Sequence, residues 1–74
     1  MTAMTIDLTG LKCPMPALLA KKHMLRAAPG TVLTILCDDP MAAIDVPHMC
    51  HTEGFEVVAV AREGDCARIL IRRP

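Results

Sequence analysis

Aromatic side chains are almost absent from this sequence of 74 residues: Phe55 is the single one, and there is neither Trp nor Tyr. A hydrophobic core must therefore be built from aliphatic side chains and methionine. An excess of charge is absent as well, because eight basic residues balance eight acidic ones. Without a net positive field the chain has little to attract a nucleic-acid backbone or an anionic membrane, so we expect no direct nucleic-acid binding.

The sequence also lacks an apolar run of the roughly 18 to 20 residues needed to span a bilayer. Residues 1–5 carry neither the basic nor the apolar part of a signal peptide. We therefore expect a cytoplasmic protein with no membrane insertion. With 74 residues, of which 53% are hydrophobic, the chain is predicted to form a single domain over residues 1–74 and to be a monomer.

None of the four cysteines is spaced C-x-x-C; they are Cys13, Cys37, Cys50 and Cys66. This spacing argues against a thioredoxin-like redox pair and against a zinc knuckle, and we expect neither a metal nor a cofactor. In a reducing compartment four free thiols are a better interpretation than two disulfides.

The hydrophobic pattern predicts strands over 5–8, 31–37, 55–62 and 66–72, and helices over 14–28 and 39–53. The first strand, helix and strand form a right-handed unit with parallel strands, and a hairpin loop at 63–65 joins the last two strands. The predicted fold class is α/β (α+β): a two-layer sandwich of order β-α-β-α-β-β, with two helices on one face of a four-stranded mixed sheet.

Finer expectations follow from the same pattern. The apolar side of the first helix is predicted to comprise Ala17, Ala20, Met24, Ala27 and Ala28 with Leu18 and Leu25.

In the second helix Asp39 is predicted as N-cap and Pro40 as first helical residue, while Pro47 should cause a kink or a restart capped by Asp45. In the last strand Ala67, Ile69 and Ile71 should face the core, and the basic residues Arg68, Arg72 and Arg73 should form a solvated surface.

The candidate for chemistry is Cys13, which lies where the first strand signal has ended and the first helix begins with Pro14. The unsatisfied N–H groups and the positive dipole end of a helix N-terminus favour a thiolate, and Lys12 is adjacent. No general base is at hand, because His23 lies almost three turns along the helix. Such a thiolate suits the acceptance and release of a reactive group better than hydrolysis, and a persulfide is one of the reversible modifications of a thiol.

Two prolines, Pro14 and Pro16, stiffen the start of this helix. Met15 and Leu19 are four residues apart and are expected to form an exposed apolar patch beside the thiol, where a partner could dock, although isolated exposed apolar residues are ordinary. Lys21 falls inside the apolar arc of the helix. Its flexible stem could simply snorkel to the helix edge, or its charge could stabilise an anionic Cys13.

The remaining thiols favour structural interpretations. Cys37 is expected to be buried and Cys66 to be partly exposed. The sequence His48-x-Cys50-His51 invites a metal hypothesis, but Cys50 points away from the face that the two histidines share, and no fourth ligand is apparent. A redox pairing of Cys50 with Cys13 is a second, weak alternative.

Several segments together resemble the TusA/SirA family of small sulfur-carrier proteins: Gly10-Leu11-Lys12-Cys13-Pro14-Met15-Pro16, Lys21-Lys22, Pro29-Gly30, Asp38-Asp39-Pro40 and Asp45-Val46-Pro47. The resemblance covers essentially the whole chain. It implies that Cys13 is a carrier cysteine, which an upstream donor, a cysteine desulfurase or rhodanese, persulfidates and which a downstream acceptor protein relieves of its sulfur. In this interpretation Lys12, Pro14, Pro16 and Lys21 support Cys13, and the partner-docking residues are Leu11, Met15, Leu19, Asp38 and Asp39.

The resemblance leaves the pathway open among tRNA thiolation, sulfur oxidation, molybdenum-cofactor supply and thiosulfate use. The expected activity is a persulfide relay, a sulfurtransferase reaction, rather than that of a stand-alone turnover enzyme. Two alternatives remain: a regulatory or nucleic-acid-binding module, and a docking subunit of a transporter complex for sulfur compounds.

Overall fold

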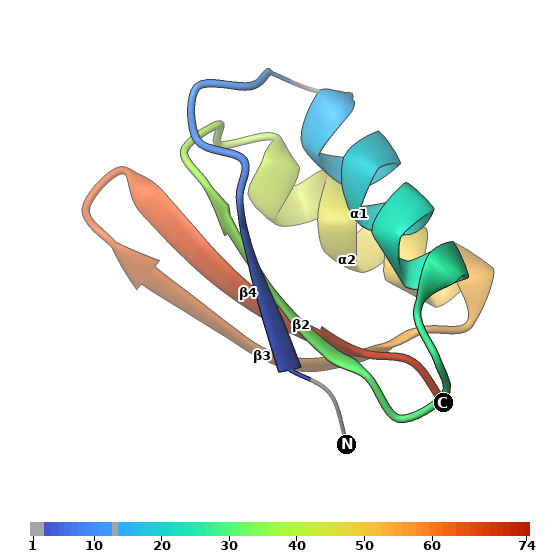
Figure 1. Cartoon of the computed structure of the whole chain (residues 1–74). Coiled ribbons are helices and arrows are strands. Elements are labelled where there is room, and N and C mark those ends of the chain that lie inside the picture. Colours follow the sequence, from blue (N-terminus) through green and yellow to red (C-terminus); the bar gives the residue numbers. More distant parts are fainter. Residues whose placement is uncertain (1–2, 13) are drawn as a thin grey trace.

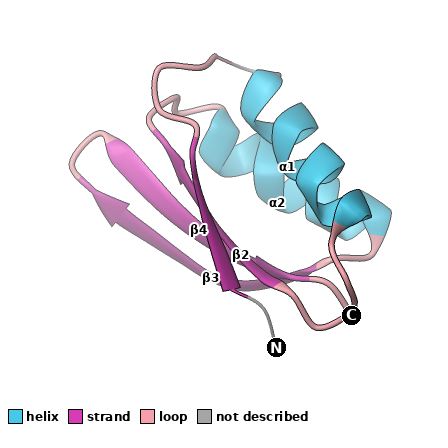
Figure 2. Ribbon diagram, in the orientation of Figure 1, coloured by secondary structure: helices cyan, strands magenta, loops and turns pink. Residues whose placement is uncertain are grey.

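Two helices lie side by side on one face of a four-stranded sheet (Figure 1). The computed structural model describes residues 3–12 and 14–74. The elements in chain order are β1 (Ala3–Asp7), α1 (Met15–Arg26), β2 (Val32–Cys37), α2 (Ala42–Glu53), β3 (Glu56–Glu63) and β4 (Cys66–Arg72). The predicted two-layer architecture is confirmed, and Figure 2 separates its helical and sheet layers by colour.

The sheet has the strand order β1-β2-β4-β3. β1 pairs in parallel with β2, and the two other pairings are antiparallel. Because β1 and β2 are parallel, they end at one edge of the sheet, which we call the carboxyl edge; the opposite edge, where β2 begins and β4 ends, is the amino edge. The chain segments that lead from β1 to α1 and from β2 to α2 therefore leave from the same edge, at the top of Figure 1.

The core lies between the helices and the facing side of the sheet. In β2 and β4 every second residue is buried, as expected for strands with one covered face. Each buried residue of β2 is paired with a buried residue of β4: Leu33 with Ile71, Ile35 with Ile69, and Cys37 with Ala67. The helices contribute Ala20, Met24, Ala42, Val46 and Cys50. The predicted burial of Cys37 and of the three β4 residues is confirmed.

The buried stripe of α1 is narrower than predicted. The residues that are buried, Pro16, Ala20 and Met24, are spaced four apart and form one line along the helix. Leu18 and Leu25 are 53% and 54% exposed, so their assignment to the buried side was wrong. The error has a simple physical cause, since a helix on a flat sheet buries only its line of contact. α1 also ends at Arg26, two residues before the predicted end.

The start of α2 differs from the prediction as well. Ala42 is its first residue and Met41 its N-cap, so the assignment of Asp39 as N-cap and Pro40 as first helical residue was wrong. A turn precedes the helix: the Asp39 carboxylate accepts a hydrogen bond from the Met41 N–H at 2.9 Å, and the Asp39 carbonyl accepts one from the Ala42 N–H at 2.9 Å. α2 then continues through Pro47 without the predicted restart, and ends at Gly54, whose φ of +82° suits a residue without a side chain.

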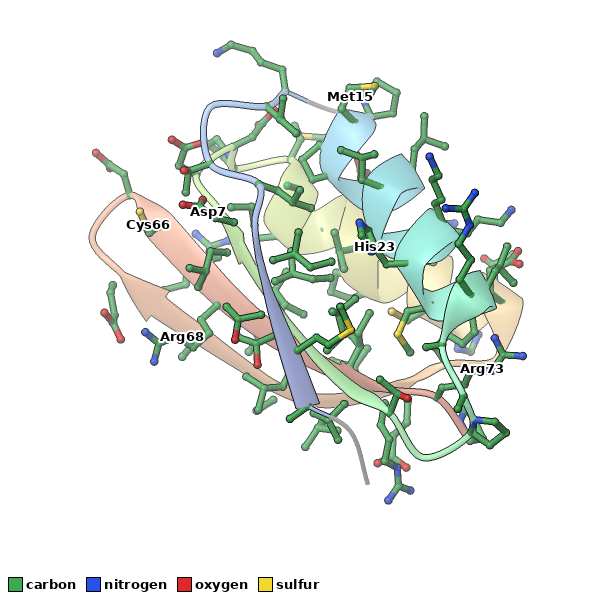
Figure 3. All side chains as sticks on the ribbon, viewed as in Figure 1. Asp7, Met15, His23, Cys66, Arg68 and Arg73 are labelled. Atoms are coloured by element: carbon green, nitrogen blue, oxygen red, sulfur yellow. The ribbon has the colours of Figure 1, made fainter. Side chains whose placement is uncertain are left out.

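The basic residues near the C-terminus do not form a free basic surface. Arg72 pairs with Glu56 at 2.8 Å, and Arg68 lies 3.9 Å from Glu63. Arg73 is half-buried, and its guanidinium donates a hydrogen bond of 2.6 Å to the Met24 carbonyl near the end of α1 (Figure 3). The prediction of a solvated surface was therefore wrong for Arg73, because the last turn of a helix has carbonyls that an arginine can satisfy.

Neither α1 nor α2, the helices of the described residues, is long and apolar enough to cross a membrane.

Candidate functional site

The predicted site lies in the segment that joins β1 to α1, at the carboxyl edge. Cys13 itself lies outside the described residues, and so do the predictions about its own geometry. The chain on either side of it is described. Lys12 and Pro14 are exposed, and the Lys12 carbonyl accepts a hydrogen bond from the Met15 N–H at 2.8 Å. The site can therefore be built from the residues that lead into and out of position 13.

The chain leaves β1 through a tight turn that Asp7 holds. The Asp7 carboxylate accepts a hydrogen bond from the Thr9 N–H at 3.0 Å and another from the Thr9 hydroxyl at 2.6 Å. Both hydrogen bonds favour the ionised carboxylate and therefore lower the pKa of Asp7, the bond from the Thr9 hydroxyl more than the bond from the Thr9 N–H. Gly10 follows with a φ of +85°, a left-handed conformation that most other residues avoid. The two hydrogen bonds to Asp7 and the left-handed conformation of Gly10 thus fix the backbone path of residues 7–10, which precede Cys13 in the sequence.

The second segment of the carboxyl edge holds the first one. The Leu36 carbonyl of β2 accepts a hydrogen bond from the Leu8 N–H at 2.8 Å, which extends the parallel ladder one residue beyond β1. Two residues later in each segment, the Asp38 carboxylate accepts a hydrogen bond from the Gly10 N–H at 2.9 Å. Asp38 and Asp39, both predicted as docking residues, therefore each bind a backbone N–H, and their contact with a partner stays a prediction.

On the helix side, α1 begins at Met15 with Pro14 as its N-cap residue, so Cys13 directly precedes the cap in the sequence. No acidic side chain lies in the first turn of α1. The positive end of the helix dipole is therefore not offset within that turn by a carboxylate. Pro16, predicted as a supporting residue, is buried and anchors the first turn against the core.

The apolar surface beside this helix start differs from the predicted one. Met15 is 43% exposed, as expected, whereas Leu19 is half-buried and packs against the core together with Leu11. The exposed neighbour of Met15 is Leu18, three residues along the same helix face. Sequence reasoning missed Leu18 because the buried stripe was centred on Ala17 rather than on Pro16. The predicted exposed patch of Met15 and Leu19 is thus corrected to Met15 and Leu18.

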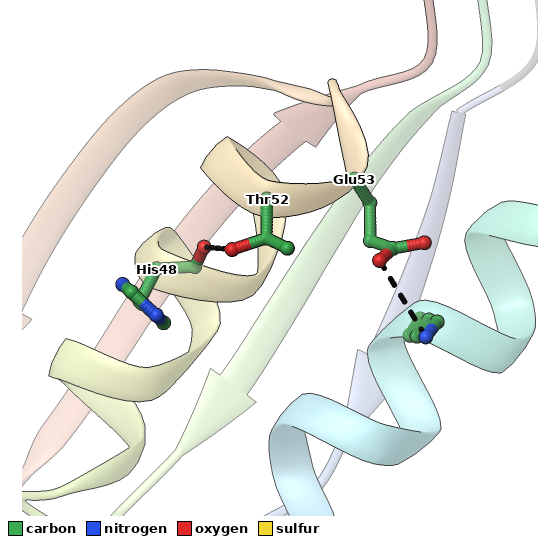
Figure 4. A network of polar contacts seen from close by, with 4 residues as sticks. His48, Thr52 and Glu53 are labelled. Atoms are coloured by element: carbon green, nitrogen blue, oxygen red, sulfur yellow. Dashed lines mark hydrogen bonds and ion pairs between the residues drawn. The ribbon is translucent and has the colours of Figure 1, made fainter.

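A groove between α1 and α2 starts at Pro14 and encloses about 440 Å³. Its lining comprises Pro14, Ala17, Leu18 and Lys21 from the α1 side and Asp45, His48, Met49, Thr52 and Glu53 from α2. At one place the ammonium group of Lys21 lies 3.5 Å from the Glu53 carboxylate, and the neighbouring Thr52 hydroxyl donates to the His48 carbonyl (Figure 4). Lys21 thus snorkels to the helix edge and pairs with α2; its predicted support of Cys13 stays a prediction.

Two of the remaining thiols, Cys37 and Cys50, are buried and protonated near pH 7, so they are poor nucleophiles. Cys50 is completely buried, and burial raises its pKa to about 11. Burial, and after it the charges of Asp38 and Asp39, raises the pKa of Cys37. Both are therefore neutral thiols near pH 7, and a buried Cys50 is a poor redox partner. Cys66 is exposed at the start of β4, beside the β3–β4 turn (Figure 3).

The metal hypothesis for the second helix gains no support. His48 and His51 are exposed while Cys50 faces the core. Among residues 3–12 and 14–74 there is no group of three His, Cys, Asp or Glu side chains that could hold a metal ion.

The fold and the site define a small α/β sandwich whose carboxyl edge presents a cysteine-bearing segment at a helix start. The same fold occurs in a solved SirA-like protein from Desulfitobacterium hafniense, which is 25% identical to this chain and superposes with a TM-score of 0.82, over 93% of this chain and 95% of the other. The family model described as sulfurtransferase TusA matches residues 4–73. The chain belongs to the TusA family of sulfurtransferases, which act as sulfur carriers together with partner proteins.

Proposed function

We propose that this protein carries sulfane sulfur as a persulfide on Cys13, between a donor protein and an acceptor protein. The observation that carries the proposal is the family match over residues 4–73, which includes the segment Gly10 to Pro16. The Cys13 thiolate attacks the outer sulfur of the donor's persulfide. A sulfur–sulfur bond forms on Cys13, the donor's own bond breaks, and the donor cysteine leaves as a thiolate. A thiolate of the acceptor then attacks the outer sulfur on Cys13, and Cys13 is released as a thiolate.

The choice of Cys13 among the four cysteines rests on its surroundings in the sequence and on the state of the others. Cys37 and Cys50 are buried neutral thiols. Cys66 is exposed at the start of β4 and does not directly precede a helix in the sequence. Cys13 precedes the start of a helix with no acidic residue in its first turn and follows the basic Lys12. These features favour a thiolate at position 13 and support its role as carrier.

Docking of the partner proteins is assigned to the surface around Pro14. Met15 and Leu18 supply exposed apolar area, and the groove between the helices begins there. Leu11 and Leu19, half-buried, act by holding the segment and the helix in place. The proposal includes a monomer in the reducing cytoplasm, where a free thiolate persists.

The test is loading by a persulfidated rhodanese or by a cysteine desulfurase with cysteine as substrate. Intact-mass spectrometry under non-reducing conditions should show a gain of about 32 Da, one sulfur atom as a persulfide. Cys13→Ser should show none, and Cys66→Ser should load like the unmodified protein. Loading of Cys13→Ser at the normal rate and extent would contradict the proposal.

A further inference from the structure

The segments after β1 and after β2 lie together at the carboxyl edge, and a side chain of one is bound to the backbone of the other (Figure 1). The bond joins the Asp38 carboxylate to the Gly10 N–H at 2.9 Å, between residues 28 apart in the sequence. Gly10 stands three residues before Cys13. We propose that Asp38 is a positioning residue, whose carboxylate fixes the path of the segment that presents Cys13; this inference rests on the proposed function.

Asp38 is itself well anchored. It directly follows Cys37, which is completely buried and whose thiol lies 3.9 Å from the Ala67 carbonyl of β4. On its other side, the Asp39 carboxylate holds the turn into α2 through the Met41 N–H. The Asp38 carboxylate is thus attached to a backbone that a buried strand and a helix start fix from both directions. An acceptor held in this way restrains the position of the donor that it binds.

The segment around Cys13 is tied down on both sides. Before it, Leu8 binds β2 and Gly10 binds Asp38; after it, the Met15 N–H binds the Lys12 carbonyl, and the Leu18 N–H binds the Pro14 carbonyl at 3.1 Å. Without Asp38, the last hydrogen bond that joins residues 8–12 to the segment of β2 would be the one at Leu8, and only the packing of Leu11 against the core would follow it. Sulfur transfer needs the attacking thiolate in line with the sulfur–sulfur bond that breaks, so a segment with fewer ties should reach that alignment more rarely.

A competing explanation is that Asp38 contacts a partner through its negative charge. Two substitutions separate the explanations. Asp38→Asn keeps an oxygen that can accept from Gly10 but removes the charge, whereas Asp38→Ala removes both. Asp65→Asn is the matched control, since Asp65 lines the same hollow as Asp38, about 430 Å³ in volume, but lies on the β3–β4 turn.

Two quantities should be measured on each variant of the full chain. The first is the hydrogen-exchange rate of the Gly10 amide by NMR, and the second is kcat/KM for loading by persulfidated rhodanese. In Asp38→Ala we expect exchange about tenfold faster and kcat/KM about tenfold lower, a factor in the range of one hydrogen bond to a charged group. Asp38→Asn, which keeps a neutral acceptor, should recover part of both effects and stay within about fivefold of the unmodified protein. Asp65→Asn should stay within about twofold in both.

The inference is overturned if Asp38→Ala leaves loading unchanged. It is also overturned if Asp38→Asn loads as poorly as Asp38→Ala while its Gly10 amide stays protected, because the charge would then act on the partner. Failure of the proposed function is recognised separately: the unmodified protein would take up no sulfur on Cys13, whatever the Gly10 amide does. Since Asp38→Asn retains the acceptor, it remains informative even if Asp38→Ala folds poorly.

Discussion

The two edges of the sheet are built differently. At the amino edge the chain binds itself closely: the Gly30 N–H donates to the Arg73 carbonyl at 2.8 Å, the Arg73 N–H donates to the Thr31 carbonyl at 2.9 Å, and Thr31 is buried. At the carboxyl edge the Leu8 N–H donates to the Leu36 carbonyl at 2.8 Å, and the contacts beyond Leu8 include those of the exposed carboxylates of Asp7 and Asp38. The apolar side chains of Met15 and Leu18 remain open to solvent.

The difference indicates a division of labour within one small domain. At the amino edge hydrogen bonds join the start of β2 to the end of β4 and the end of β4 to the end of α1, and these bonds contribute to the stability of the fold. The carboxyl edge fixes the backbone near Cys13 but leaves side chains free to meet a partner, as expected of loops that carry function. Changes in the core and at the amino edge should therefore lower the free energy of unfolding and leave sulfur transfer unchanged. Changes at the carboxyl edge should impair sulfur transfer and leave the free energy of unfolding nearly unchanged.

The largest effect is expected from the buried thiol of Cys50, in the last turn of α2. Its pKa is about 11 in the folded protein, against 9.0 as the ordinary value. As the pH rises above 9, the unfolded chain loses this proton while the folded protein keeps it, so the unfolded state gains stability. The free energy of unfolding should fall by roughly 2 to 2.5 kcal/mol from this group between pH 8 and 11, and hardly at all below pH 8.

Urea unfolding from pH 7 to 11 measures this effect. Cys50→Ala should be less stable at pH 7 because of the cavity that it leaves, but its stability should fall less steeply above pH 9. Cys66→Ala, which changes an exposed thiol, is the matched control and should keep the slope of the unmodified protein. Cys37, which is present in all these proteins, contributes in the same direction. Equal slopes for Cys50→Ala and Cys66→Ala would contradict the assignment.

A somewhat smaller effect is expected at the amino edge itself. Arg73→Ala removes the hydrogen bond to the Met24 carbonyl and a cation from the end of α1. We expect a loss of about 1.5 to 2 kcal/mol in the free energy of unfolding, since a charged donor to a half-buried carbonyl is lost. Urea unfolding at pH 7 measures the loss.

Arg68→Ala is the control for this change, because its ion pair with Glu63 is exposed and 3.9 Å long. It should cost less than about 0.5 kcal/mol. Sulfur loading of both folded variants should match that of the unmodified protein. A loading defect in Arg73→Ala at full folding would break the distinction between the two edges.

The smallest energetic effect is expected from the exposed leucine at the carboxyl edge. Leu18→Ser removes apolar area from the groove wall beside Pro14. The KM for a protein sulfur donor should rise by about fivefold to tenfold, the range expected when a side chain is removed from an interface. Stability should stay within about 0.5 kcal/mol, because Leu18 is mostly exposed.

Leu25→Ser is a matched control on the same helix, since Leu25 is as exposed as Leu18 but does not line the groove. Steady-state loading rates for both variants compare the two positions. If they raise the KM equally, the groove has no special part in docking.

Much of this arrangement could be predicted from the sequence. The alternation of Ala67, Ile69 and Ile71 with Arg68 and Arg72 identifies the covered face of β4, because a strand has a period of two residues. The succession of strand and helix signals likewise predicts two layers and a mixed sheet. These features depend on neighbours within a few residues, and such patterns are visible in the sequence.

The errors concern contacts between distant segments. Leu18 and Leu19 are adjacent, and only the angle at which α1 lies on the sheet decides which of them packs inward. The carboxylate of Asp38 looks like that of any turn residue, yet its partner is Gly10 in another segment. Arg73 likewise resembles a surface cation until α1 is placed beside it. Such pairings depend on tertiary structure and have no local signal.

The most direct test of the central claim is to locate the transferred sulfur. After loading by persulfidated rhodanese and alkylation, trypsin should separate the thiols into three peptides: residues 13–21 with Cys13, residues 27–62 with Cys37 and Cys50, and residues 63–68 with Cys66. The account predicts the added sulfur on residues 13–21. Its appearance mainly on residues 63–68 or 27–62 would contradict the account.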